Sequence, residues 1–270
     1  MAGEKLPRGV FWKVGLTLYA LALLGAALVL PYVLALERGA LAAAAARSHL
    51  AIGILLAVSF AQSALLLAIA VFAGLWAARK LGLGAPILAA LYSRSPLPQR
   101  TAATLTFAIA AGLVTGGALI ALDRYVFMPM PSVAAFIAQA RHAGAQPSPW
   151  QGFLASFYGG LDEEILMRLG LLSLLGLFLR MIAGGRADGR ALLPGGVFWT
   201  ANIVTALLFG AGHLPAAAAI APLTAALTLR VVALNALGGL VFGWLYRRFG
   251  LEWAMGSHFA CDIVLHVVTG

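Results

Sequence analysis

Long apolar stretches recur along the whole chain, and short groups of charged, glycine or proline residues separate them. Stretches of about 18 or more residues with few charges are typical of helices that cross a hydrocarbon core about 30 Å thick. The pattern therefore predicts an all-α fold, a polytopic transmembrane helical bundle of about seven spans. The predicted spans are Val10 to Leu36, Leu50 to Ala78, Ala102 to Leu122, Trp150 to Ile182, Val197 to Gly212, Ala217 to Tyr246 and Trp253 to Val268.

Three stretches of the chain need a separate interpretation. The apolar segment Ala85 to Tyr92 is too short to cross a membrane, and we expect it to lie along the surface. The segment Pro129 to Pro149 is polar and interrupted by prolines, which predicts a loop. The first apolar run, Val14 to Leu36, follows basic residues as in a secretory signal. Its length of about 23 residues exceeds the roughly 7 to 15 of a signal's apolar region, which favours a retained anchor helix.

The composition agrees with a protein embedded in a lipid bilayer. Hydrophobic residues make up 62% of the chain and charged residues 10%, whereas soluble domains have about 25% charged residues. With no linker or low-complexity segment, the sequence predicts one continuous membrane domain. Its first part, residues 1–149, has helices without a recognisable motif, and residues 150–270 hold the chemistry described below. The single cysteine, Cys261, excludes an intrachain disulfide.

The net charge of +9 comes from Lys and Arg residues scattered between apolar segments, so it predicts membrane orientation and no nucleic-acid partner. Cytoplasmic loops collect Lys and Arg, so the richer side is expected to be cytoplasmic. Alternation of the spans assigns to the N-terminal side Lys5, Arg8, Lys13, Arg79, Lys80, Arg94, Arg100, Arg180, Arg186, Arg190, Arg247 and Arg248, and to the other side only Arg38, Arg47, Arg124 and Arg141. We expect a multi-pass protein of the inner cell membrane with a cytoplasmic N-terminus and an outward C-terminus.

Ionisable residues inside the predicted spans require an explanation, because each costs about 2.5 to 3.5 kcal/mol at the centre of a bilayer. They form three clusters in the fourth, fifth and last spans: Asp162, Glu163, Glu164 and Arg168; His213; and His258, Asp262 and His266. Glu164 and Arg168 lie four residues apart on one helical face and can neutralise each other. Glu163 points about 100° away from that face, so its partner must come from another helix or from a hydrated cavity.

The other two clusters supply such partners. His258, Asp262 and His266 follow one another at steps of four residues and form one polar stripe. His213 follows Phe209 by four residues and precedes Pro215, which ends or bends the helix there. We therefore expect the clusters to share one buried, hydrated site. A poorly solvated carboxylate beside an imidazole is a general-base arrangement that can activate water, and a second pair can hold an oxyanion.

Other interpretations of the same residues remain open at this stage. The polar groups can be structural hydrogen bonds between helices, and this is the favoured interpretation for Glu164 with Arg168 and for His266. Two histidines with Glu and Asp also suit zinc, which would make a metal-dependent intramembrane protease, although no HExxH motif is present. A Cys261 nucleophile is disfavoured, because a lone thiol in an apolar helix usually packs. A proton-relaying transporter is disfavoured by the absence of an internal repeat.

The spacing of these residues resembles a known family. The order is Glu-Glu-x-x-x-Arg at Glu163, Glu164 and Arg168, then Phe-x-x-x-His at Phe209 and His213, then His-x-x-x-Asp at His258 and Asp262. It resembles the CPBP family of CAAX prenyl endopeptidases and bacteriocin-processing or bacteriocin-immunity proteins. The resemblance covers roughly Trp150 to Gly270, including the segment from Gly239 to Arg248.

The resemblance implies a glutamate-dependent intramembrane endopeptidase that needs no metal or other cofactor. Glu163 and His213 would activate water, His258 and Asp262 would form the oxyanion site, and Glu164, Arg168 and Phe209 would support them. The implied partner is a membrane-anchored or transmembrane peptide or protein substrate. A catalytically idle scaffold or immunity protein is the alternative. The eukaryotic prenyl proteases have Asn where this chain has Asp262. An ionised Asp cannot donate to an oxyanion, so its role is open between a protonated donor and a charged partner of His258.

Overall fold

The computed structural model describes residues 7–142, 146–185, 188–189 and 192–268, and every regular element in these ranges is helical. Six helices there are long and apolar enough to cross a membrane: Arg8–Leu36, Ile52–Lys80, Thr101–Phe127, Pro149–Ile182, Gly195–Ile220 and Ala225–Arg248. The last helix, α13 (Leu251–Asp262) with its π-helical extension η4 (Ile263–Val268), is not among the six. It packs against α6 (Thr101–Leu122) and α12 (Ala225–Arg248). The predicted polytopic helical bundle is confirmed.

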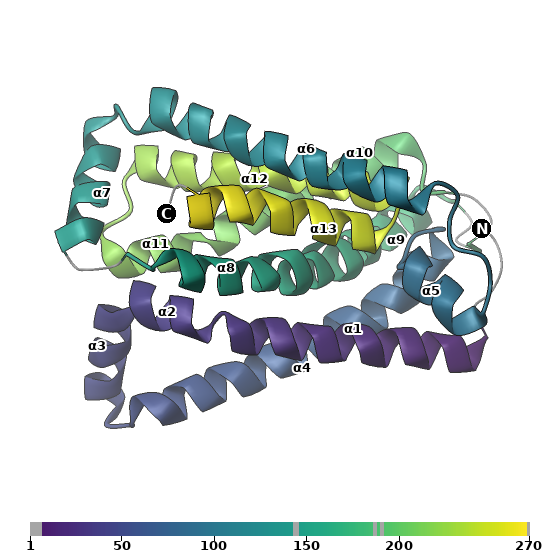
Figure 1. Cartoon of the computed structure of the whole chain (residues 1–270), viewed down its shortest axis with the longest axis horizontal. Helices are drawn as coiled ribbons and strands as arrows, with labels where there is room; N and C mark the ends of the chain where they lie inside the picture. The colour runs from purple at the N-terminus through teal and green to yellow at the C-terminus, as the bar shows by residue number, and fades with distance from the viewer. Residues whose placement is uncertain (1–6, 143–145, 186–187, 190–191, 269–270) are drawn as a thin grey trace.

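Successive long helices run in opposite directions (Figure 1). Helix α1 (Arg8–Leu28) and its continuation α2 (Leu30–Leu36) are followed by α4 (Ile52–Lys80), α6, α8 (Pro149–Tyr158) with α9 (Ser173–Ile182), α10 (Gly195–Gly212), α12 and α13. Short helices cap the bundle: α3 (Arg38–Ser48) and α7 (Pro131–His142) lie at one end, and α5 (Pro86–Ser93) at the other. The start of α1 and the end of η4 therefore lie at opposite ends of the bundle.

The predicted loop from Pro129 to Pro149 is wrong in its middle, where α7 forms. Pro131 is the first residue of this helix, a position where the missing N–H of proline costs nothing. Val133 is fully buried, and Phe136 packs against the cluster formed by Leu227 and Val231 of α12. The prolines that suggested a loop therefore delimit a short helix, whose apolar positions bury against α12.

The predicted span from Ala217 to Tyr246 is also corrected, because a break divides it. Helix α11 (Leu214–Ile220) ends before Pro222, and α12 begins only at Ala225. The hydroxyl of Thr224 accepts a hydrogen bond from the backbone N–H of Leu227 at 3.2 Å, which caps the start of α12. The crossing helix is thus α12 alone.

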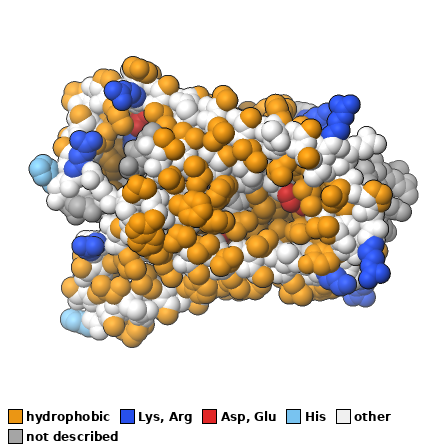
Figure 2. All heavy atoms as spheres, viewed as in Figure 1, with side chains coloured by type: hydrophobic (Ala, Val, Ile, Leu, Met, Phe, Trp, Pro, Cys, Tyr) orange, Lys and Arg blue, Asp and Glu red, His pale blue; other side chains and the backbone are white. Residues whose placement is uncertain are grey.

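The surface of the bundle matches an apolar environment. Large side chains point outward along the long helices, with Leu65 66% and Val114 71% exposed. Figure 2 shows hydrophobic side chains over the middle of one face, with Lys and Arg gathered towards the two ends. A backbone that satisfies its hydrogen bonds within helices and presents apolar side chains outward is what a bilayer requires. The chain is a multi-pass membrane protein.

Helix α13 is held in the bundle by close approach of backbones. A Cβ atom added at Gly112 of α6 would meet the backbone of Ser257, with its carbonyl carbon 2.8 Å away. Small residues at helix crossings permit such contacts in membranes. There, van der Waals packing rather than the hydrophobic effect drives the association of helices. Ser257 precedes His258, so this crossing sets the depth and rotation of the helix that carries the polar stripe.

Candidate active site

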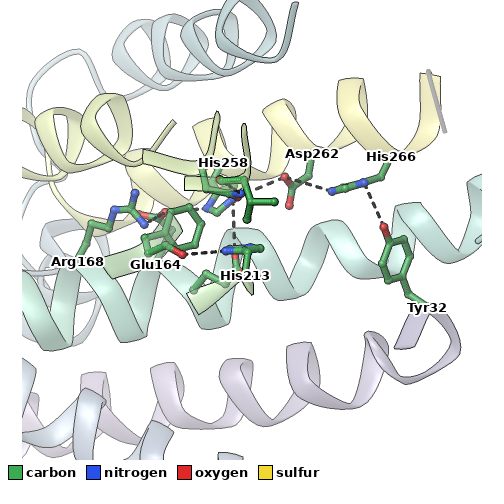
Figure 3. Close-up of polar contacts among 11 residues, drawn as sticks. Tyr32, Glu164, Arg168, His213, His258, Asp262 and His266 are labelled. Carbon is green, nitrogen blue, oxygen red and sulfur yellow. Dashed lines mark hydrogen bonds and ion pairs between the residues drawn. The ribbon is translucent and has the colours of Figure 1, made fainter. Parts of the chain in front are cut away.

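Two adjacent glutamates approach the two nitrogens of one histidine, and Figure 3 labels Glu164 and His258 among these residues. The long fourth span is π-helical over η2 (Gly159–Glu163) and η3 (Ile165–Leu172), with Glu164 between them. Glu164 Oε1 lies 2.8 Å from His258 Nδ1, and Glu163 Oε2 lies 3.5 Å from His258 Nε2. π-Helical turns are wider than α-helical turns and are frequent at functional sites. The two neighbouring carboxylates therefore lie at different nitrogens of the same imidazole.

Glu163 also reaches a third helix. Its Oε1 lies 3.6 Å from Nε2 of His213, the residue that caps the C-terminus of α10. His213 Nδ1 is 2.8 Å from the carbonyl oxygen of Phe209. A carbonyl only accepts, so Nδ1 carries the proton, and in the neutral ring Nε2 keeps a lone pair directed at the Glu163 side. The Glu163 and His213 side chains are 18% and 35% exposed, so this edge of the site is open.

Glu164 has a fully buried side chain that serves two partners. Its Oε1 lies 3.0 Å from Arg168 Nη1 as well as 2.8 Å from His258 Nδ1. Arg168 Nη2 donates to the carbonyl oxygen of Gly239 on α12 at 2.9 Å. The expected pairing of Glu164 with Arg168 is present, and the carboxylate also contacts His258, which the sequence analysis missed. Glu164 thereby connects η3 with α13 directly, and with α12 through Arg168.

Aromatic rings surround the two imidazoles. Phe242 of α12 stacks on His258 with ring centroids 4.4 Å apart and an interplanar angle of 19°. Phe209 presents an edge contact to both His213 and His258, at 4.9 Å and 5.8 Å, and the Arg168 guanidinium lies 5.1 Å from its ring centroid. Phe209 thus joins the histidines to the arginine. The contact of Phe242 with His258 was not predicted. The one feature of the sequence that could have indicated it is the position of Phe242 near Gly239 and Gly243, on a face of α12 suited to close packing.

Asp262 lies between two histidines of its own helix. Its Oδ1 is 3.6 Å from His258 Nε2 and 4.0 Å from His266 Nε2. The hydroxyl of Tyr32, from α2, lies 3.5 Å from His266 Nδ1. Figure 3 shows the contacts from Asp262 through His266 to Tyr32 as dashed lines. Tyr32 belongs to the part of the chain in which no motif was recognised. A tyrosine in an apolar span is common, so the sequence carried no signal for it.

Two singled-out residues lie apart from these contacts. Asp162 is fully buried, and within the described residues neither of its carboxyl oxygens has a hydrogen-bond partner. A Cβ atom at Gly25 of α1 would collide with it. Cys261 is buried in the hydrophobic core, which is the packing role expected for it. Over the described ranges, no group of three or more His, Cys, Asp or Glu side chains is arranged to hold a metal ion.

An apolar groove of about 450 Å³ lies beside the polar cluster. It is lined by α6, η2 and α13, with Ile109, Leu161 and Phe259 among its walls. Leu161 lies two residues before Glu163, so the groove and the carboxylate share the π-helical segment. The molecule therefore places an apolar surface next to its membrane-embedded polar centre.

Comparison with known protein families matches one of them, described as type II CAAX prenyl endopeptidase Rce1-like, over residues 145–264. The matched segment contains Glu163, Glu164, Arg168, His213, His258 and Asp262, and it ends before His266. Comparison with the curated proteins and with the solved structures gave no match. The CAAX-type members of this family are membrane proteases that act on membrane-associated substrates. Over residues 145–264, which is less than half of the chain, this multi-pass membrane protein is similar to the Rce1-like family of type II CAAX prenyl endopeptidases.

Proposed function

We propose that the protein is an intramembrane endopeptidase in which Glu163 is the general base that activates water. The observation that carries this proposal is the place of Glu163 between two imidazoles, 3.6 Å from His213 Nε2 and 3.5 Å from His258 Nε2. These three side chains come from three separate helices, although each is costly inside a membrane. Packing alone does not require three such groups at one point.

Water activation follows from the tautomer of His213. Because Nδ1 donates to the Phe209 carbonyl, Nε2 of the neutral ring is an acceptor. A water molecule between Glu163 and His213 can donate one hydrogen to each, and its oxygen lone pairs are then free to attack a carbonyl carbon. Separations of about 3.5 Å or more between polar groups suit a bridging water. Glu163 takes one proton as the carbon–oxygen bond forms, and it returns that proton to the leaving amine when the carbon–nitrogen bond breaks.

His258 is assigned to the oxyanion that forms during the attack. In its doubly protonated form it donates from Nδ1 to Glu164 and from Nε2 to the oxyanion. Asp262 lies with Oδ1 towards two imidazole Nε2 atoms, which favours an acceptor that pairs with His258 over a donor to the oxyanion. Asp262 then assists through His258.

Glu164, Arg168 and Phe209 hold this geometry. Arg168 is fixed by Glu164 and by the Gly239 carbonyl, and its guanidinium lies over the Phe209 ring. Phe209 supplies both the carbonyl that sets the His213 tautomer and the ring that contacts His258. The proposal therefore gives these three residues positioning roles.

The substrate proposed is a membrane-anchored or transmembrane peptide or protein. The apolar groove beside η2 suits the apolar part of such a molecule. The match to a family described as CAAX prenyl endopeptidases supports a substrate that ends in a prenylated CAAX sequence. An obligatory metal or other cofactor is not part of the proposal. The alternatives are a catalytically idle scaffold or immunity protein and a metal-dependent protease.

The test uses the full chain in lipid nanodiscs with a quenched fluorescent peptide that ends in a farnesylated CAAX sequence. We expect cleavage that exceeds that of the same peptide without the lipid and that persists after treatment with EDTA. Absence of cleavage of every lipidated or transmembrane peptide tried would favour the idle scaffold. Loss of activity in EDTA, restored by stoichiometric zinc, would show that the histidines and carboxylates are ligands instead.

A further inference from the structure

We propose that Asp262, His266 and Tyr32 form a proton relay that connects the catalytic cluster to the membrane interface at the end of α2. The inference rests on the proposed function, because it deepens the chemistry of the same site. Two of its three members lie outside the family match: Tyr32 in the first span and His266 beyond residue 264. The N-terminal half of the chain thereby contributes a functional side chain.

Adjacent residues of α8 bring the two outer members together. Gln151 Nε2 donates to the carbonyl oxygen of Pro31 at 2.9 Å, which holds α2 against α8. A Cβ atom at the next residue, Gly152, would collide with the backbone of His266, so η4 lies in direct contact with the same helix. The Tyr32 and His266 rings then meet edge to face with centroids 5.6 Å apart. Their contact is a consequence of how α2 and η4 pack on α8.

Successive separations along the chain suit proton transfer with occasional bridging water. They are 3.5 Å from Glu163 to His258, 3.6 Å from His258 to Asp262, 4.0 Å from Asp262 to His266 and 3.5 Å from His266 to Tyr32. A water bridge replaces a direct hydrogen bond at little enthalpic cost. Every member carries an atom that both binds and releases a proton, which an apolar or amide side chain cannot do.

The outer end of the relay, at His266 and Tyr32, lies near the end of the first span. The His266 side chain is 37% exposed, whereas the His258 side chain is only 6% exposed. Glu37 and Arg38 directly follow α2, and charged residues at the end of a span mark the headgroup level. Tyr32 lies only five residues before Glu37, at a depth where aromatic side chains with a polar tip are favoured. The path therefore runs from the buried His258 to the interface.

Peptide hydrolysis supplies the proton that this path carries. The attacking water gives its oxygen to the new acid, one proton to the leaving amine through Glu163 and one proton that remains on the new carboxylic acid. His258 passes its Nε2 proton to Asp262 and takes up the second proton from the new acid in its place, and Asp262 then protonates His266 Nε2. His266 releases a proton from Nδ1 towards Tyr32, and water at the interface accepts it. The released amine takes up a proton from solvent, which balances the reaction.

The groups around His266 define what a pH profile will report. Its own helix contributes Asp262 and His258, α2 contributes Tyr32, and α10 contributes His213. Of the helices packed on η4, α8 has Tyr158 as its single titratable side chain and α6 has none. Beyond His258 lie Glu163, Glu164 and Arg168. A change in the pH dependence of kcat on replacing His266 therefore reports the titration of the relay together with that of the catalytic cluster.

The test measures kcat of the full chain in nanodiscs, with the farnesylated peptide, for His266→Ala and Tyr32→Phe. Tyr19→Phe is the matched control, because Tyr19 packs against the core from α1 and is not part of the site. We expect kcat to fall about tenfold in His266→Ala and less in Tyr32→Phe. Both losses are below the roughly 10²- to 10⁴-fold of a group that exchanges protons with the substrate, because these residues act only through Asp262. Imidazole added to His266→Ala should restore most of the rate, whereas pyrazole, a ring of similar shape and far weaker basicity, should not. The kinetic solvent isotope effect should rise in both variants.

Equal rescue by pyrazole would show that His266 only fills space, and it would overturn the relay. An unchanged kcat and solvent isotope effect in Tyr32→Phe would also overturn it, because that variant keeps the ring contact and removes the hydroxyl alone. The proposed function fails differently: the unaltered chain would not cleave the peptide, or Glu163→Gln would cleave it at the same rate.

Discussion

At the scale of single residues, the Glu163 carboxylate lies between two imidazoles, and the Glu164 carboxylate lies between an imidazole and a guanidinium. An ionisable side chain in a span needs a partner, and this argument identifies Glu163, His213 and His258 from the sequence. In the structure, Glu163 lies 3.6 Å from His213 and 3.5 Å from His258. The contact of Glu164 with His258 joins residues that lie 94 positions apart, so local periodicity does not reveal it. Regular α-helical periodicity, on which the sequence analysis relied, points the two glutamates in different directions.

The doubled role of Glu164 gives a prediction about stability. Replacement by Gln removes the anion that faces both Arg168 and His258, and it leaves the buried guanidinium without a counter-charge. Removal of one partner of a buried ion pair costs about 3 to 5 kcal/mol. We therefore expect Glu164→Gln to lower the free energy of unfolding, measured by denaturant titration in detergent, by about that amount. Glu163→Gln is the matched variant, and an equal loss in both would contradict the separate roles.

At the scale of helices, apolar length predicted where most spans lie but not where they break. The run from Ala217 to Tyr246 reads as one apolar span, yet Pro222 and the Thr224 cap start α12 only at Ala225. In the opposite sense, the prolines around α7 suggested a loop, because the packing of Phe136 against Leu227 and Val231 of α12 is a tertiary contact that local composition does not reveal. Tyr32 shows the same limit, since its partner His266 is 234 residues away.

The crossing of α6 and α13 gives a prediction at this scale. An alanine at position 112 would place a methyl group against the backbone of Ser257, which cannot turn aside as a flexible side chain can. Gly117, on the same helix, has open space around the added atom. We expect Gly112→Ala to destabilise the protein by about 1 to 3 kcal/mol and to lower peptide cleavage, because α13 carries His258. Gly117→Ala should leave the melting temperature and the cleavage rate nearly unchanged. Equal effects of the two substitutions would contradict this account of the crossing.

At the scale of the whole molecule, the alternation of the long helices places α3 and α5 at opposite ends of the bundle (Figure 1). The side on which each end lies is a prediction from the distribution of Lys and Arg, which favours a cytoplasmic N-terminus.

Cysteine labelling tests the predicted orientation in intact cells. Ser93→Cys, in α5, should react only with a membrane-permeant maleimide, and Ser48→Cys, at the end of α3, should also react with an impermeant one. The native Cys261 is buried and serves as the background. The reverse pattern would mean that the charge distribution does not set the orientation, and labelling of both from outside would contradict the alternation of the helices.

The central claim is that the Glu163 carboxylate activates the attacking water. Its most direct test is the single-turnover rate of farnesylated-peptide cleavage by Glu163→Gln and by the unaltered chain, measured in the same nanodiscs in EDTA. Gln preserves the shape of the side chain and removes the base, so we predict a loss of at least about a hundredfold with an unchanged melting temperature. A folded Glu163→Gln variant that cleaves at the rate of the unaltered chain would contradict the account.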